Sequence, residues 1–153
     1  MPKQKTLEEV YLECNSQGQF KNQEIVNKEK VKTMLGIANA SMEAAETIKK
    51  KIDSKSQQWC VVYTLYYDAL RELVEALILF DKKKIFNHQC LFAYLCTEHQ
   101  ELELDWNFFE KIRTKRNGIN YYGTPVKFDD FKEMELQLKL YIKALERAIK
   151  EKV

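Results

Sequence analysis

Glycine and proline are scarce in this chain. Its 153 residues include only four Gly and two Pro, and no proline lies between Lys28 and Tyr122. Strands joined by tight turns need more of both residue types, so the scarcity excludes a β-rich fold and favours an all-α one. Gly118, Gly123 and Pro125 fall within eight residues of one another, which predicts one sharp break late in the chain.

The chain also lacks a long apolar run. Its longest stretch without a charged residue, Ile85 to Thr97, has 13 residues, whereas a membrane span requires about 18. The first ten residues, MPKQKTLEEV, contain no apolar core of a secretory signal. We therefore expect a cytoplasmic protein with no membrane partner.

Residue patterns for metal and cofactor chemistry are missing as well. The four cysteines form no CxxC pair, so in a cytoplasmic protein we expect reduced thiols in the core. No histidine completes a zinc spacing with Cys90 and Cys96, and Glu72 and Glu75 lack the Glu-x-x-His partners of a di-iron site. The chain has no glycine-rich phosphate loop and no GxSxG turn. The sequence thus predicts neither a metal nor a cofactor.

The residues that are present indicate a helical bundle. With 45% apolar and 31% charged residues, the chain can form one compact domain and is not disordered. Apolar spacings of three and four residues and candidate caps predict helices over 6–15, 27–52 and 57–80, and three more that begin after Asn87, after Asp105 and at Asp129. We expect an all-α, antiparallel bundle of about five to six helices, with a short helix and loop in 1–26 and the bundle in 27–153.

The predicted third helix, residues 57–80, is apolar on nearly every face. Such a helix belongs at the centre of a bundle or in a subunit interface. The aromatic side chains of Tyr63, Tyr66, Tyr67 and Phe92 are therefore candidates for either the core or a dimer interface.

Basic residues gather in one late segment. Residues 111–128 hold five Lys or Arg and no acid, and Arg113 and Arg116 are two of only four arginines in the chain. Matching of charge to a helix dipole explains part of this asymmetry. Arginine also has the planar fork that suits phosphate, and Tyr121 and Tyr122 supply the aromatic residues that a single-stranded nucleic-acid binder uses.

The stretch RNGINYYG, residues 116–123, concentrates these features. On a helix, Arg116 shares a face with Asn120, and Asn117 shares a face with Tyr121. Fraying of a helix before Gly123 is the plain structural explanation. Binding of RNA or a nucleotide by Arg113, Arg116 and the neighbouring Asn and Tyr side chains is the functional one.

This segment resembles the motif of the HEPN domain family of small helical bundles, in which an Arg, often followed by Asn, precedes a His by four to six residues. Arg116 and Asn117 match, and Tyr121 stands in the place of the His. The order of elements over about 28–152 is also similar, because an aromatic-rich central helix is followed by a segment, NHQCLFAYL, like the family's recurring Ser/Asn-His segment.

The resemblance implies a homodimer whose polar motifs face each other. It also implies a metal-independent ribonuclease, with Arg gripping phosphate and His moving protons, and a partnership with a minimal nucleotidyltransferase in a toxin–antitoxin pair. In some members the partner adenylylates a Tyr two residues beyond the His, and Gly123 occupies that position here.

The exchange of His for Tyr changes the expected chemistry. A histidine with a pKa near about 6.5 transfers protons at pH 7, whereas a tyrosine near about 10 stays protonated and only donates a hydrogen bond. We therefore expect a dimer that binds RNA or a nucleotide through Arg116, Asn117 and Tyr121, assisted by Arg113, Asn120 and Tyr122, with weak or no cleavage.

Two alternatives remain open. The first is an active metal-independent endoribonuclease toxin that uses Arg116 with Tyr121 or with His88, a histidine that a helix N-terminus would keep neutral. The second is a purely structural helical interaction module. His88 and His99 are otherwise expected to be buried or capping residues.

Overall fold

The computed structural model describes residues 4–153, and in this part of the chain the fold is all-α as predicted. Its helices are α1 (Leu7–Ser16), α2 (Lys28–Lys49), α3 (Trp59–Leu79), α4 (His88–Glu98), α5 (Trp106–Tyr122) and α6 (Phe128–Lys150). A 3₁₀ turn, η1 (Gln100–Leu102), follows α4. Two short strands, β1 (Lys21–Asn22) and β2 (Lys83–Lys84), pair antiparallel and join the segment after α1 to the end of α3.

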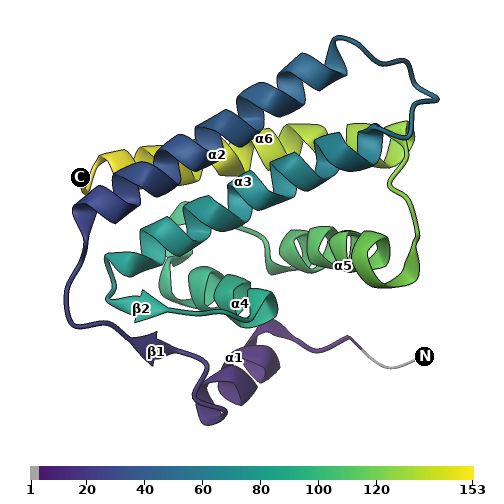
Figure 1. Cartoon of the computed structure of the whole chain (residues 1–153). Coiled ribbons are helices and arrows are strands. Elements are labelled where there is room, and N and C mark those ends of the chain that lie inside the picture. The colour runs from purple at the N-terminus through teal and green to yellow at the C-terminus, as the bar shows by residue number, and fades with distance from the viewer. Residues whose placement is uncertain (1–3) are drawn as a thin grey trace.

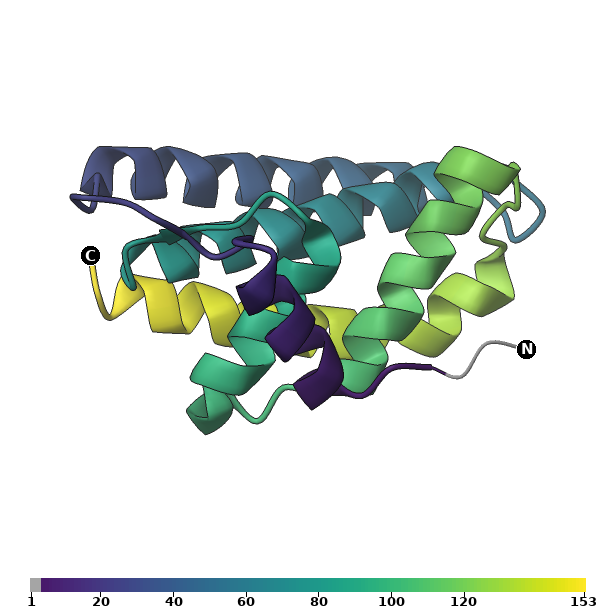
Figure 2. The same cartoon turned by 90° about the horizontal axis from the view of Figure 1, so that it is seen from below.

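The three long helices α2, α3 and α6 run alongside one another, with α3 in contact with both of its neighbours (Figure 1). α2 and α3 are antiparallel, whereas α6 runs in the same direction as α3, because α4 and α5 intervene along the chain. The shorter helices pack on the other side of α3, and the view from below places α1 in front of α4 (Figure 2). In this arrangement α3 is the central helix, because it contacts α2, α6, α4 and α5.

Local sequence signals mark most helix starts correctly. The side chains of Thr6, Asn27, Asn87 and Asp105 each accept a backbone N–H in the first turn of α1, α2, α4 and α5. The predicted start of α6 at Asp129 is wrong, since the helix begins at Phe128. The N–H of Lys127 donates to Asp130 Oδ2 at 3.0 Å, and the Phe128 ring packs against Trp59 with ring centroids 4.9 Å apart.

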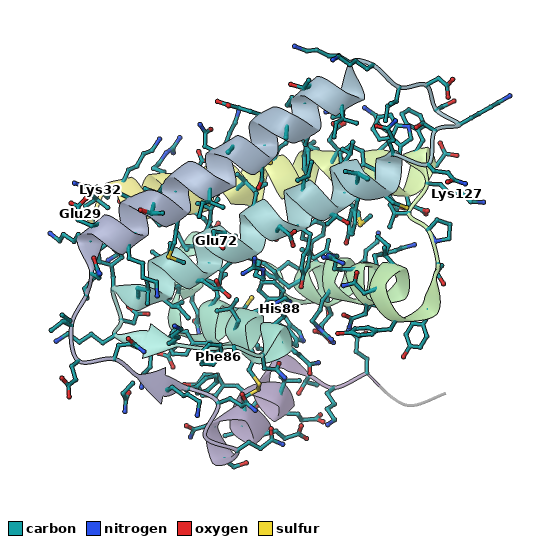
Figure 3. The ribbon with its side chains drawn as sticks, in the orientation of Figure 1. Glu29, Lys32, Glu72, Phe86, His88 and Lys127 are labelled. Carbon is teal, nitrogen blue, oxygen red and sulfur yellow. A yellow bond between two sulfur atoms is a disulfide. The ribbon has the colours of Figure 1, made fainter. Side chains whose placement is uncertain are left out.

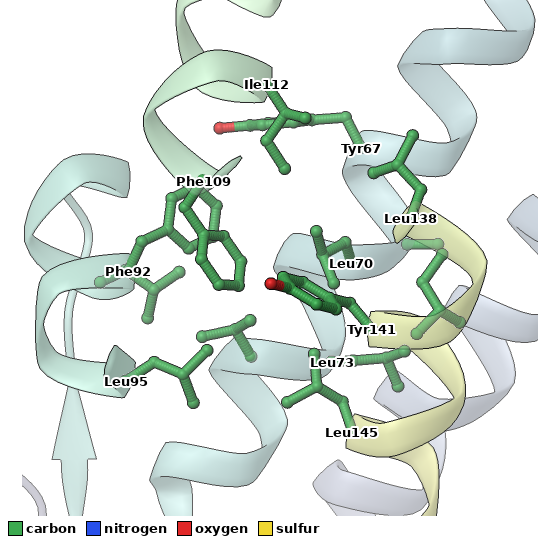
Figure 4. Packing of buried hydrophobic residues seen from close by; sticks show 14 of the residues in the cluster. Tyr67, Leu70, Leu73, Phe92, Leu95, Phe109, Ile112, Leu138, Tyr141 and Leu145 are labelled. Atoms are coloured by element: carbon green, nitrogen blue, oxygen red, sulfur yellow. The ribbon is translucent and has the colours of Figure 1, made fainter. Parts of the chain in front are cut away.

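The core is centred on the apolar face of α3. Figure 4 shows Tyr67, Leu70 and Leu73 of this helix packed against side chains of α4, α5 and α6. The side chains of Tyr63, Tyr66, Tyr67 and Phe92 are all at most 1% exposed within the single chain. The suggestion that these aromatics serve a dimer interface is therefore wrong, because the bundle itself buries them.

The expectation of reduced cysteines is also wrong for two of the four. α1 packs on α4, and this brings the Cα atoms of Cys14 and Cys90 to 5.7 Å, where the two sulfurs form a disulfide. The bridge ties the N-terminal helix to the first turn of α4. Cys60 and Cys96 are free thiols.

Candidate functional site

Arg116 projects from α5 toward α3. Its guanidinium carbon lies 6.0 Å from the centroid of the Tyr67 ring, and Nη2 lies 3.9 Å from Asp68 Oδ1. Nη1 donates to Asn120, the residue four positions later on the same face, as the helical spacing predicts. The Arg116 Nε is buried and has no hydrogen-bond partner among the described residues. The guanidinium is thus positioned by its neighbours, with hydrogen-bonding capacity to spare.

Arg113 lies one turn earlier on α5 and is held more tightly. Its Nε and Nη2 donate to the two oxygens of Glu110 at 3.0 and 3.1 Å, a bidentate pair. Glu110 is buried, and its Oε2 also accepts from Gln89 Nε2 at 3.0 Å. Because Gln89 follows His88 directly, this pair fixes the start of α4 against α5.

His88 lies at the N-terminus of α4, where Asn87 caps the helix (Figure 3). Its Nδ1 is 3.1 Å from the hydroxyl of Tyr67. Burial lowers the pKa of His88, and Arg71, Arg116 and Arg113 lower it further, while Asp68 acts in the opposite direction. Three of the chain's four arginines thus act electrostatically on this imidazole, and we call Arg71, Arg113 and Arg116 the arginine cluster.

The lowered pKa favours the neutral form of the His88 imidazole at pH 7, and part of the residue remains open to solvent. Burial raises the pKa of Tyr67, so its hydroxyl keeps its proton despite the nearby arginines. Tyr67 can donate to Nδ1 of His88 or accept from it. When Nδ1 carries the ring proton and donates it to Tyr67, Nε2 is free to accept a proton from a substrate.

Tyr121 and Tyr122 lie apart from the arginine cluster. Tyr121 is five residues after Arg116, which places it about 140° around the helix. Both tyrosines are largely exposed, at 75% and 80%. With Asn117 and Arg113 they line an open groove of about 940 Å³ along the outer side of α5, which we call the outer groove.

The structure thus divides the predicted site into two parts. Arg113, Arg116, Asn120 and His88 belong to the region between α3, α4 and α5, whereas Asn117, Tyr121 and Tyr122 lie on the outer groove. Arg113 is common to both, because it pairs with Glu110 and also lines the groove.

Sequence reasoning missed the contribution of α3, which supplies Tyr67, Asp68 and Arg71. One signal was available, since Arg71 is one of four arginines and stands in the most apolar helix of the chain. Nothing in the sequence connects it with Arg116, because both come to act on His88 only when α3, α4 and α5 pack together.

His99 belongs to a different environment. It is buried, with Nε2 2.6 Å from Asp81 Oδ2 and Nδ1 3.1 Å from Glu101 Oε1. Asp81 also accepts from the Tyr94 hydroxyl at 3.1 Å. These contacts join the end of α3 to the end of α4, which is the buried, structural role that the sequence suggested.

Residues 4–153 contain neither a cluster of metal ligands nor a membrane-spanning helix. No group of three or more His, Cys, Asp or Glu side chains in this range is placed to hold a metal ion. No helix in the same range combines the length and the hydrophobicity that crossing a bilayer requires.

Comparison of the chain with protein-family models, with curated proteins and with solved structures finds no match.

Proposed function

We propose that this chain binds RNA or a nucleotide, with the arginine cluster as the phosphate-binding site. The observation that carries the proposal is the position of Arg116, whose guanidinium carbon lies 6.0 Å from the Tyr67 ring beside His88 and whose only carboxylate neighbour among residues 4–153 is Asp68, at 3.9 Å. Guanidinium groups bind phosphate oxygens through paired N–H donors, and Arg116 has N–H groups on Nη1 and Nη2 beyond those that contact Asn120 and Asp68.

The outer groove supports RNA rather than a small anion as the ligand. Tyr121 and Tyr122 expose their rings beside Asn117, and Lys111 and Lys115 line the same groove. Exposed aromatic rings beside basic side chains suit unstacked bases with their phosphates. Arg113 connects this groove to the arginine cluster.

Further parts of the proposal rest on the HEPN resemblance alone. They are a homodimer and a minimal nucleotidyltransferase partner of the toxin–antitoxin type. We further propose a cytoplasmic location, on the residue patterns of the sequence. Such a location is unusual for a disulfide-bonded protein. A dimer interface would use residues other than the buried aromatics of α3.

Ribonuclease activity is the second candidate, and His88 is the observation that favours it. A neutral imidazole that Arg71, Arg113 and Arg116 influence electrostatically can accept the proton of an RNA 2′-hydroxyl while an arginine binds the phosphate. Tyr121 lies on the outer groove and does not share this position.

The test of the binding proposal compares RNA affinities by fluorescence anisotropy. A labelled single-stranded RNA of mixed sequence is titrated with wild type, Arg116→Ala, Arg116→Lys and the control Arg147→Ala, which removes an exposed arginine on α6. We expect Arg116→Ala to weaken binding about tenfold or more, Arg116→Lys to restore part of it, and the control to match wild type.

Cleavage is tested by incubating RNA in EDTA with the same proteins and with two further variants, His88→Ala and Tyr121→Phe. Loss of cleavage in His88→Ala but not in Tyr121→Phe would establish the ribonuclease. Equal RNA affinity in wild type and in Arg116→Ala, with both proteins folded by circular dichroism, would overturn the binding site. No RNA binding at all would leave the helical interaction module.

A further inference from the structure

A second cavity lies beside the arginine cluster. It has a volume of about 310 Å³ and is enclosed by α2, α3 and the segment from β2 to Phe86. Its apolar lining comes from Met34, Ile78, Leu79 and Ile85, all of which are buried. The cavity therefore has an apolar floor that the fold itself forms.

Polar groups of both signs line the same cavity. Glu72 and Glu75 of α3 supply carboxylates whose side chains are only 16% and 29% exposed. Lys30 of α2 and Lys83 and Lys84 of β2 supply ammonium groups. A ligand for this cavity must offer hydrogen-bond donors on one edge and acceptors on another.

An aromatic side chain completes the lining. Phe86 is 63% exposed although it directly follows the buried Ile85, and the Lys84 ammonium lies 5.1 Å from its ring centroid. Figure 3 shows Glu72, Phe86 and His88 on the same face of the molecule. The exposed ring offers a surface on which a flat heterocycle can stack.

We propose that this cavity is a guanine pocket, which selects the base next to the phosphate held by the arginine cluster. The inference rests on the proposed function, because it needs RNA to be the ligand. Guanine presents two adjacent donors, N1–H and the 2-amino group, that a carboxylate of Glu72 or Glu75 can accept together. It also presents the acceptors O6 and N7, to which lysine donates.

The other bases fit this set of groups less well. Adenine places an acceptor, N1, where guanine has a donor, so it would face a carboxylate lone pair. Uracil has a single N–H between two carbonyl oxygens, and cytosine offers only its 4-amino group as a donor. Both pyrimidines also present a smaller surface to Phe86.

Arg71 connects the guanine pocket to the phosphate site. Its Nη1 lies 3.0 Å from Glu75 Oε2 and its Nη2 lies 3.6 Å from Glu72 Oε2. Tyr67, Arg71 and Glu75 follow one another at four-residue intervals on α3, so each step along this face is about 6 Å. A base at Glu75 and a phosphate at Arg71 and His88 are therefore separated by a length that one nucleotide covers.

The pKa of the Glu75 carboxyl agrees with this geometry. Burial raises the pKa of this carboxyl, and Arg71 lowers it only in part. An ionised carboxylate that is incompletely compensated is stabilised by two further N–H donors, which is what the guanine edge provides.

The test uses short RNAs that differ at one base. A labelled oligoadenylate with one central guanosine is compared with the same oligomer carrying inosine, which lacks the 2-amino group, and with oligoadenylate alone. For wild type we expect the guanosine RNA to bind about five- to a hundredfold more tightly than oligoadenylate, with inosine in between.

Variants then assign the preference to the cavity. In the double variant Glu72→Gln/Glu75→Gln the guanosine and adenosine RNAs should bind about equally. Glu43→Gln, at an exposed position of α2, is the control and should keep the wild-type preference. Phe86→Ala, a change at an exposed residue, should weaken guanosine RNA without affecting folding.

Three results separate the outcomes. Equal weakening of every RNA by the double variant would mean that the two glutamates only hold Arg71, which overturns the guanine pocket. Arg116-dependent RNA binding without a guanosine preference in wild type would overturn it as well, and would leave the proposed function standing. Absence of any RNA binding would instead be the failure of the proposed function.

Discussion

The two groups of charged side chains that face α3 differ in how completely they are paired. On the side of α2 and α6, Lys49 is bound to Glu46 and Tyr66 at 3.2 Å and also to Glu135. On the side of α4 and α5, Arg116 has only Asn120 and a distant Asp68. We call the first group, Lys49 with Glu46, Tyr66 and Glu135, the Lys49 network.

Ionisation behaviour reflects the same contrast. Burial raises the pKa of Glu135, but hydrogen bonds from Lys132 and Lys49 outweigh this effect and bring the pKa down to about 2. The charge is therefore satisfied within the fold. The pKa of His88 is instead lowered, by burial and by the arginine cluster. Its charged form is disfavoured until an anion arrives.

This difference separates a structural network from a binding one. Partly buried charges that find all their partners inside the chain hold helices together, whereas an excess of one sign at an open position stabilises a ligand of the other sign. If this interpretation is correct, changes in the Lys49 network alter stability without altering RNA binding. Changes at Arg116 do the reverse.

Removal of the disulfide should have the largest effect on stability. The bridge between Cys14 and Cys90 closes a loop over a sequence separation of 76, and loss of such a cross-link costs about 3–4 kcal/mol. We expect this loss of unfolding free energy in Cys14→Ala/Cys90→Ala, measured by urea denaturation. Since Cys90 lies two residues after His88, RNA affinity should fall as well, which would show that the binding side depends on the anchoring of α4.

Thiol titration in denaturant provides the control for this prediction. The non-reduced chain should show two free thiols, Cys60 and Cys96, and the reduced chain should show four. Four thiols in the protein as purified without reductant would contradict the bridge, and would instead support the reduced cysteines expected from the sequence.

Lys49→Met should be the next largest change. It removes the closer of the two lysines that Glu46 and Glu135 share, in a region where the Lys49 and Glu135 side chains are only 16% and 12% exposed, and leaves Lys139 at 3.7 Å from both. We expect a loss of about 3 kcal/mol in unfolding free energy, by urea denaturation, with RNA affinity unchanged. Lys143→Met, at an exposed position on α6, is the matched control and should change stability by at most about 0.5 kcal/mol. A fall in RNA affinity in folded Lys49→Met would remove the distinction between the two sides.

Most of the fold could be predicted from the sequence because its signals are local. The caps Asn27, Asn87 and Asp105 each act within the next turn of the same chain segment, and the apolar stripe of 27–52 reports one buried helix face. The disulfide between Cys14 and Cys90 has no such signal, since it depends on how α1 folds back on α4. The start of α6 was misplaced for a related reason, because the packing of Phe128 on Trp59 lies outside the local pattern.

The candidate site was predictable only where its residues lie on one helix. Arg116 and Asn120 are four apart and interact as expected, whereas Tyr121 is turned away to the outer groove. The convergence of α3 and α4 on Arg116 is tertiary, so the roles of Tyr67 and Arg71 could not be predicted from spacing.

The smallest expected effect is the pH dependence of RNA binding. It tests most directly the charged side chains on the side of α4 and α5. His88 faces Tyr67, Asp68 and Arg71 of α3 and Arg113 and Arg116 of α5, and its pKa in the free protein is below the ordinary value of about 6.5. A bound phosphate stabilises the imidazolium, so binding raises this pKa. Affinity should therefore be constant above the pKa of the complex and increase as the pH falls toward the pKa of the free protein.

We expect a total gain of about two- to fivefold between pH 8 and pH 5, the size of one partly exposed charge pair, measured by anisotropy at constant ionic strength. His88→Gln should bind RNA at pH 8 about as well as wild type and show no gain at low pH. His99 is the only other histidine, and it is enclosed by Asp81 and Glu101. A gain that persists in His88→Gln would therefore assign the titration elsewhere, and the three arginines around His88 would no longer mark the place where phosphate binds.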